Sequence, residues 1–150
     1  MPTNRDKPTA NAMEPVPHRV LVVDDDPSQR ATLDALLSAS GLCEVVCAAS
    51  VGEAERLLRR ADFDVVVADY DMPDGTGLRL LEQVGNASPH TTGVLITGHA
   101  SDTPDLTLAR THRRVFRIVL KPYDPQMFIG WVKSAIALSR MRRSGVHPVS

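Results

Sequence analysis

The chain has 150 residues, enough for one domain of ordinary size, and hydrophobic residues make up 43% of it. Its 17 Lys and Arg residues nearly balance its 18 Asp and Glu residues, so the overall charge predicts no attraction to nucleic acid or to an anionic membrane. The apolar runs are far too short to span a bilayer, and the N-terminus lacks the apolar stretch of a signal peptide. We therefore expect a cytoplasmic protein without membrane contact.

The pattern along the chain divides it into two tails and one domain. We expect residues 1–18 to form a flexible N-terminal tail, residues 19–140 the folded domain, and residues 141–150 a C-terminal tail or the start of a linker. Most of the strand-length apolar runs in the domain are nearly continuous in Val, Ile and Leu, as in parallel strands covered on both faces. In chain order the expected strands are Val20–Asp24, Cys43–Ala48, Val65–Asp69, Gly93–Thr97 and Phe116–Lys121.

Helical patterns separate these runs, and several of them begin with a recognisable cap. Asp26-Pro27 and Asp124-Pro125 each place an N-cap residue before a proline, and Ser50 opens a capping box with Glu53. In chain order the expected helices are one between Asp26 and Gly41, one from Ser50 to Ala61, one from about Gly77 to Val84, a weak one over Pro104–His112 and one that begins at Asp124-Pro125.

Five strands that alternate with five helices predict an α/β fold, doubly wound around a mostly parallel sheet. Right-handed crossovers between parallel strands leave few possible topologies. In open sheets of this kind, ligands bind at the carboxyl ends of the strands. A functional site is therefore expected at that edge.

Polar side chains follow four of the buried strands. The first strand ends in Asp24-Asp25-Asp26, the third in Asp69, the fourth in Thr97 and the fifth in Lys121. Taken singly, each of these residues is more simply a helix cap, a turn residue or a solvated side chain. Because a parallel sheet gathers these strand ends at one edge, the combination predicts a single site with carboxylates, a hydroxyl group and an ammonium group.

The residue types at this edge indicate phosphoryl chemistry. Crowded carboxylates repel one another, and a bound cation relieves the repulsion. Oxygen ligands without His or Cys favour Mg²⁺, which readily shares its coordination with phosphate. An Asp side chain can act as a nucleophile, and the roughly two negative charges of an attached phosphoryl group would be offset by the cation, by Lys121 and by the Thr97 hydroxyl.

Four motifs resemble those of the CheY-like receiver domains of response regulators in two-component signal transduction systems. The order and spacing of the four make the resemblance specific, and it covers about residues 19 to 140. It implies a flavodoxin-like fold with five parallel strands in the order 2-1-3-4-5 and five helices. The motifs are Val22-Val23-Asp24-Asp25-Asp26-Pro27, Asp69-Tyr70-Asp71-Met72-Pro73-Asp74-Gly75-Thr76-Gly77-Leu78, Ile96-Thr97-Gly98 and Lys121-Pro122-Tyr123-Asp124-Pro125.

The resemblance also implies a metal site. Asp69 would be the phosphoacceptor, and Asp25 and Asp69 would bind Mg²⁺ directly. The backbone carbonyl of Asp71 would be a third protein ligand, and Asp24 would act through a metal-bound water.

The remaining motif residues would serve the phosphoryl group. Thr97 would swing towards it, and Lys121 would pair with it, after a cis peptide bond to Pro122. One position departs from the family pattern, because Ile118 stands where receivers often have an aromatic switch residue. Phe116 is expected to face the same side of the strand as Ile118.

The function implied is that of a cytoplasmic, bacterial phosphoprotein in a phosphorelay. A sensor histidine kinase or a histidine phosphotransfer protein would supply the phosphoryl group, and the modification would switch an interaction surface. The domain would catalyse only its own phosphorylation and dephosphorylation. A homodimer through the fourth helix, fifth strand and fifth helix is a further expectation, without direct nucleic-acid binding. Too few residues follow Arg140 for an output domain, so the sequence leaves open a lone receiver or a piece of a longer protein.

Two alternatives remain open from the residues alone. A phosphatase of the haloacid-dehalogenase type also uses an aspartyl nucleophile with Mg²⁺, and Asp24-x-Asp26 or Asp69-x-Asp71 superficially fits its first motif. No acidic pair follows Lys121, however, and the chain has no room for a cap domain. A pseudo-receiver used only for docking is disfavoured because every phosphotransfer residue is present.

Overall fold

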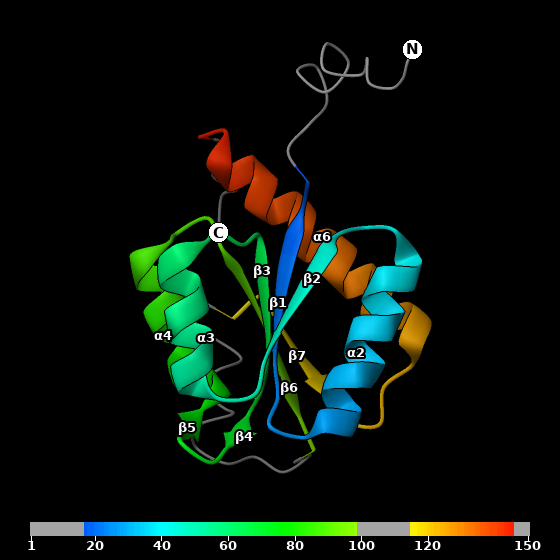
Figure 1. The fold of residues 1–150 in the computed structure, drawn as a ribbon. Helices are drawn as coiled ribbons and strands as arrows, with labels where there is room; N and C mark the ends of the chain where they lie inside the picture. Colours follow the sequence, from blue (N-terminus) through cyan, green and yellow to red (C-terminus); the bar gives the residue numbers. More distant parts are fainter. Residues whose placement is uncertain (1–16, 99–114, 146–150) are drawn as a thin grey trace, which may run out of the picture.

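A parallel sheet forms the centre of the structure, a computed structural model that describes residues 17–98 and 115–145 (Figure 1). Within these residues the sheet has five strands in the order β2-β1-β3-β6-β7, with every neighbouring pair parallel. This is the order that the family resemblance implied, and each strand end lies within one residue of its expected position. The strands are β1 (Arg19–Val23), β2 (Glu44–Ala48), β3 (Val65–Asp69), β6 (Thr92–Thr97) and β7 (Arg117–Leu120).

The described helices are α2 (Pro27–Ser40), α3 (Val51–Arg60), α4 (Gly77–Ala87) and α6 (Pro125–Arg143). The expected caps are confirmed: Asp26 and Asp124 accept hydrogen bonds from backbone amides of α2 and α6. Gly41, at φ 72°, ends α2 in the left-handed conformation that favours glycine. α4 continues past Val84 to Ala87, so it is longer than expected. The weak helix expected over Pro104–His112 lies outside the described residues.

Helices cover both faces of the sheet, which explains why its central strands β1, β3 and β6 are almost wholly buried. α2 and α6 pack on one face, and α3 and α4 pack on the other (Figure 1). Along β1, Val20 and Val22 face the first layer, whereas Leu21 and Val23 face the second, and all four are fully buried. Within the described residues, no helix is long and apolar enough to cross a membrane.

A two-stranded hairpin that the sequence analysis did not predict follows β3. It consists of β4 (Asp71–Met72) and β5 (Gly75–Thr76), which pair antiparallel around a turn at Pro73 and Asp74. In Figure 1 the hairpin lies at the end of the sheet where the parallel strands finish. It therefore borders the edge at which the sequence places the functional site.

The expectation that Phe116 and Ile118 face the same side is wrong. Ile118 packs with the layer of α3 and α4, whereas Phe116 packs with the layer of α2 and α6. β7 begins only at Arg117, so the two-residue alternation of a strand does not extend back to Phe116. Phe116 therefore does not supply an aromatic ring on the Ile118 side of the sheet.

A network of ion pairs joins the end of α6 to the edge of the sheet at which the parallel strands begin, opposite the edge with the predicted site. Asp64, which precedes β3, is 1% exposed, and its carboxylate accepts hydrogen bonds from Ser139 Oγ at 3.2 Å, Arg143 Nε at 2.9 Å and Arg140 at 3.1 Å. Arg143 also donates to Asp62 at 2.5 Å. Because the buried carboxylate has several charged donors, the network fixes the last turns of α6 to the sheet.

Candidate metal centre and phosphoacceptor site

Backbone hydrogen bonds continue the sheet beyond the strand ends and thereby position the functional residues. The amide of Asp24 donates to Ala48 at 3.1 Å, the amide of Tyr70 donates to Ile96 at 2.7 Å, and the amide of Lys121 donates to Thr97 at 2.9 Å. These bonds hold the residues that follow β1, β3 and β7 at one edge, as the strand-end pattern predicts.

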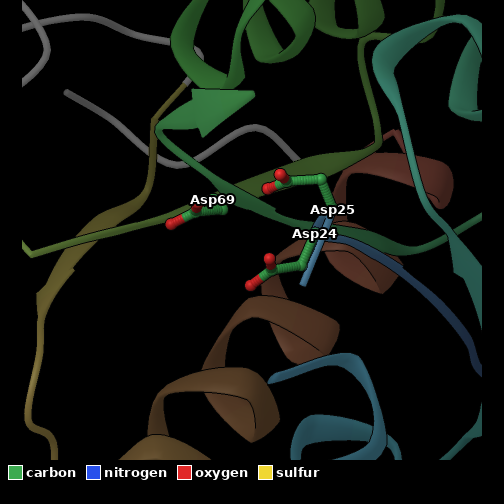
Figure 2. A group of neighbouring side chains, drawn as sticks. All are labelled: Asp24, Asp25 and Asp69. Carbon is green, nitrogen blue, oxygen red and sulfur yellow. The ribbon is translucent and has the colours of Figure 1, made fainter. Parts of the chain in front are cut away.

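Three carboxylates meet at this edge (Figure 2). Asp24, Asp25 and Asp69 each offer a carboxylate oxygen, and these oxygens all lie within 4.8 Å of one another. Asp24 is 2% exposed and Asp69 is 9% exposed, whereas Asp25 is exposed. The cluster is thus buried on one side and open to solvent on the other.

Lys121 completes the cluster with a positive charge. Its Nζ lies 3.1 Å from Oδ1 of Asp69. The peptide bond between Lys121 and Pro122 is cis, as the resemblance implied. The ion pair leaves Asp24 and Asp25 without an equally close cation among the described ion pairs.

Burial dominates the protonation of these groups. It raises the pKa of Asp24 above its usual value, and the charges of Asp69 and Asp25 raise it further, against the amide of Asp26 and the charge of Lys121. Burial likewise raises the pKa of Asp69, although the hydrogen bond and charge of Lys121 act in the opposite direction. Burial disfavours the charged Lys121 ammonium, but Asp69 outweighs it and holds the pKa of Lys121 above its usual value. The site therefore has more negative charge than Lys121 alone offsets.

These residues fit a hard divalent cation. Each donor is a carboxylate oxygen, and two of the three carboxylates are held in a buried setting that disfavours their charge. Burial and the neighbouring carboxylates both raise the pKa of Asp24 and Asp69, and a cation at this position would favour their charged forms. The exposed side, at Asp25, leaves room for the waters that Mg²⁺ usually retains.

The other predicted site residues lie around the cluster. Thr97 ends β6 and is 1% exposed, one position beyond the pairing of Asp69 with Ile96. Asp71 lies in β4 with an exposed side chain. Asp26 caps α2 through the amide of Ser28, which matches the cap predicted for it.

Sequence reasoning missed three residues that fix the backbone of the site. Arg30 donates to the carbonyl of Asp24 at 2.7 Å and so holds the turn between β1 and α2. Gly77 lies against the carbonyl group of Asp69, where a Cβ atom would collide with the oxygen and stand 2.9 Å from the carbon. Asp74 accepts hydrogen bonds from the amides of Val51 and Gly52, both at 3.0 Å. The sequence Pro73-Asp74-Gly75 is typical of a turn and could have indicated the hairpin. The contacts that these residues make with distant segments could not be predicted from a local sequence pattern.

An apolar groove adjoins the site on the side of α2 and α6. Two neighbouring hollows share Thr32 and Leu36 of α2. One extends along α6 to Ile129, and the other reaches Lys121. The groove therefore leads from the space between the two helices to Lys121, which forms the ion pair with Asp69.

The comparisons with known proteins agree with one another. A family model described as the response regulator receiver domain matches residues 20–133. The transcriptional regulatory protein GlrR of Escherichia coli K12 is 32% identical over 123 residues, which are 82% of this chain and 27% of GlrR. The chain spans about a quarter of the length of the curated relatives it matches.

Solved structures resemble the chain over most of its length. The signal receiver domain of an HD domain-containing protein from Pseudomonas fluorescens Pf-5 has a TM-score of 0.80 and 25% identity, covering 88% of this chain and 97% of that one. The response regulator protein TrrA of Thermotoga maritima, solved in complex with Mg(2+)-BeF, has a TM-score of 0.69 and 25% identity, covering 79% of this chain and 98% of that one. With its strand order, its acidic cluster and the family match over most of its length, the chain belongs to the response regulator receiver domains, a family of two-component signalling modules that are phosphorylated on an aspartate.

Proposed function

We propose that this receiver domain accepts a phosphoryl group on Asp69 from the phosphohistidine of a sensor histidine kinase or a histidine phosphotransfer protein. The observation that carries the proposal is the arrangement around Asp69, with Lys121 Nζ at 3.1 Å and the carboxylates of Asp24 and Asp25 within 4.8 Å. This arrangement places a nucleophile beside a fixed cation and beside oxygen donors for a second cation.

In this proposal Mg²⁺ is the second cation. Asp25 and Asp69 bind it directly, the backbone carbonyl of Asp71 is a third protein ligand, and Asp24 acts through a metal-bound water. The ion supplies positive charge against the phosphoryl oxygens. The raised pKa of Asp24 and Asp69 supports this assignment, because burial and the neighbouring carboxylates disfavour the charged forms of both side chains before a cation binds.

The transfer itself needs one bond to form and one to break. A carboxylate oxygen of Asp69 attacks phosphorus, and the bond from phosphorus to the donor's imidazole nitrogen breaks. The electron pair of that bond returns to the imidazole, and the product on this chain is an acyl phosphate. Lys121 and the Thr97 hydroxyl hold the phosphoryl oxygens. The added charge of roughly two then shifts a conformational equilibrium of the domain and so changes its interaction surface.

The apolar groove between α2 and α6 is the proposed docking surface for the phosphodonor. It is lined by side chains such as Leu36 and Ile129, and it reaches Lys121. A helix of the donor that lies in this groove would bring its phosphohistidine close to Asp69, because the groove ends at Lys121, the ion-pair partner of Asp69.

A homodimer is a second proposed partner arrangement. It would use β7, α6 and the helix expected over Pro104–His112, and Met127 of α6 is 55% exposed. The helix expected over Pro104–His112 lies outside the described residues. Sedimentation with and without a phosphoryl mimic tests this arrangement, and a monomer in both states contradicts it.

We also propose that the chain is not an enzyme towards other molecules and that it does not itself bind nucleic acid. GlrR is named as a transcriptional regulatory protein, and a fused output domain would be the part that contacts DNA in a protein of that kind. Hydrolysis of many equivalents of a simple phosphomonoester per chain would favour the phosphatase alternative. We expect no such turnover.

The test of the acceptor is phosphorylation by a small acyl phosphate with Mg²⁺, followed by intact-mass analysis. The wild type should gain one phosphoryl group, and Asp69→Asn should gain none, because an amide is not a comparable nucleophile. Asp26→Asn is the matched control, since Asn also caps helices and should leave the reaction unchanged. An equal adduct on Asp69→Asn contradicts the assignment.

A further inference from the structure

The loop that follows the phosphoacceptor is fastened to a helix on the far side of the β4–β5 hairpin. Asp74, at the turn of the hairpin, accepts the amide of Val51 on Oδ1 and the amide of Gly52 on Oδ2, both at 3.0 Å. These two amides open α3, and helix-opening amides have no partners within their own helix. One carboxylate therefore joins the loop to α3 by two hydrogen bonds across more than twenty residues of sequence.

α3 already has a cap of its own. Ser50 Oγ accepts the amide of Glu53 at 3.1 Å, as the capping box predicts. The Asp74 contact is thus not needed to start the helix, although it stabilises the same end. The hydrogen bonds from Gly52 and Val51 hold the pKa of Asp74 below its usual value, so the carboxylate stays charged at neutral pH.

The open end of the hairpin, away from the turn at Asp74, is held next to Asp69 and the start of α4. Asp71 of β4 pairs with Thr76 of β5, and Thr76 Oγ1 accepts the amide of Arg79 in the first turn of α4. The amide of Gly77 donates to the carbonyl of Tyr70 at 2.9 Å. The segment between Asp69 and α4 is thereby held at both ends, by α4 on one side and by Asp74 on the other.

We propose that Asp74 is a positioning residue for the cation of the phosphoacceptor site. This inference rests on the proposed function, in which the backbone carbonyl of Asp71 is a metal ligand. By fixing the tip of the hairpin to α3, Asp74 fixes the peptide group of Asp71 at the mouth of the site. Its two hydrogen bonds act on cation affinity and leave the chemistry of Asp69 unchanged.

The reason that Asp71 needs such support is that it contributes a backbone atom. A carboxylate ligand can adjust its side-chain torsions, whereas a carbonyl ligand moves only with the chain. Mg²⁺ demands near-ideal octahedral geometry, so a displaced carbonyl is lost as a ligand. Loss of a group that orients a ligand typically weakens metal binding by about tenfold or more, and we expect about tenfold weaker Mg²⁺ binding for Asp74→Ala.

The experiment compares Asp74→Ala with Ser50→Ala in the full chain. Both variants lose a cap of α3, but only the first releases the hairpin. Mg²⁺ dissociation constants are measured by amide chemical-shift titration, and stability is measured by urea unfolding. Asp74→Asn provides an intermediate case, because its amide oxygen accepts one of the two bonds and its NH₂ group cannot accept the other.

The inference predicts a split between affinity and rate. The dissociation constant should rise about tenfold in Asp74→Ala, less in Asp74→Asn and by less than about twofold in Ser50→Ala. Phosphorylation of Asp74→Ala by a small acyl phosphate should recover the wild-type rate at saturating Mg²⁺.

Equal Mg²⁺ affinity in the wild type and both Asp74 variants would reduce Asp74 to a helix cap and overturn the inference alone. An equal loss of affinity in Ser50→Ala would also overturn it, because the effect would then come from α3. A wild-type chain that binds no Mg²⁺ overturns the proposed metal site together with this inference.

Discussion

Gly77→Ala should displace Asp69, the proposed phosphoacceptor, while leaving all the proposed reacting groups in the chain. Gly77 opens α4 against the carbonyl group of Asp69, and a Cβ atom there would lie 2.9 Å from the carbonyl carbon and 3.0 Å from Cδ1 of Leu95. The nearest clash of this Cβ atom is with the Asp69 carbonyl oxygen, and ordinary contacts of a Cβ atom begin at 3.4 Å, so α4 and the end of β3 must separate by roughly 1 Å. β3 lies between β1 and β6 and cannot move freely.

The magnitude follows from this displacement. Overpacking of a buried contact typically costs about 1–3 kcal/mol, and we expect the free energy of unfolding to fall by about 2 kcal/mol. A misplacement approaching 1 Å can slow a positioned reaction by about a hundredfold. Because this displacement is shared between α4 and the end of β3, we expect phosphorylation of Asp69 to slow by roughly ten- to a hundredfold.

The assay is the rate of phosphoryl uptake from a small acyl phosphate at saturating Mg²⁺, followed by intact mass, with urea unfolding in parallel. Gly130→Ala is the matched control, because Gly130 lies exposed within α6 and its added Cβ would have nothing within 4 Å. It should gain up to about 1 kcal/mol of stability from helix propensity and keep the wild-type rate. A Gly77→Ala variant that behaves like Gly130→Ala in both measurements would refute the reasoning.

Three further predictions concern the charges. Asp25→Ala should weaken Mg²⁺ binding strongly, whereas Asp26→Ala should leave it unchanged and cost about 1 kcal/mol as a lost cap; titrations in which both lose Mg²⁺ equally contradict this division. Asp24→Asn should stabilise the Mg²⁺-free protein by about 1 kcal/mol at pH 7. Two unit charges 4.8 Å apart repel by roughly 3 kcal/mol at an effective dielectric constant of about 20, and the removal of one charge should recover a fraction of this energy. Because burial and like charges raise the pKa of Asp24 in the folded state, the wild type recovers that stability as the pH falls through the raised value, and the two unfolding curves should converge; a constant difference from pH 7 to pH 4 would contradict the prediction. Arg143→Ala should cost about 2 kcal/mol at pH 7, as expected for hydrogen bonds to charged groups. Burial opposes the charge of Asp64, but the Arg19 amide and Arg143 outweigh it and hold the pKa of Asp64 below its usual value, so the wild type loses this stability as the pH falls below about 4 and the difference should shrink there; a difference that grows on acidification would contradict it.

The layers of the fold could be predicted because the central strands β1, β3 and β6 are buried on both faces and therefore carry nearly continuous apolar runs. Capping residues added the helix starts at Asp26, Ser50 and Asp124, which the structure confirms. The β4–β5 hairpin was not predictable in this way, since two-residue strands are too short for any periodicity. Phe116 was misplaced because the pattern cannot tell where a strand's alternation begins.

The candidate site was predictable to the extent that it is made of strand ends. The carboxyl ends of parallel strands meet by topology, so Asp24, Asp69 and Lys121 could be placed together before any distance was known. The contacts of Gly77 and Asp74 belong to a different class. They depend on how α3 and α4 approach the loop, and that approach is decided by packing between segments distant in sequence.

The central claim is that the phosphoryl group is attached to the side chain of Asp69, and chemical trapping tests it most directly. Borohydride reduces an aspartyl phosphate to homoserine, and peptide mass spectrometry locates the changed residue. After treatment with a small acyl phosphate and Mg²⁺, we expect homoserine at position 69 and at no other aspartate, and none when Mg²⁺ is withheld. Homoserine at position 24 or 25, or a phosphorylated chain with an unchanged Asp69 peptide after reduction, would contradict the account.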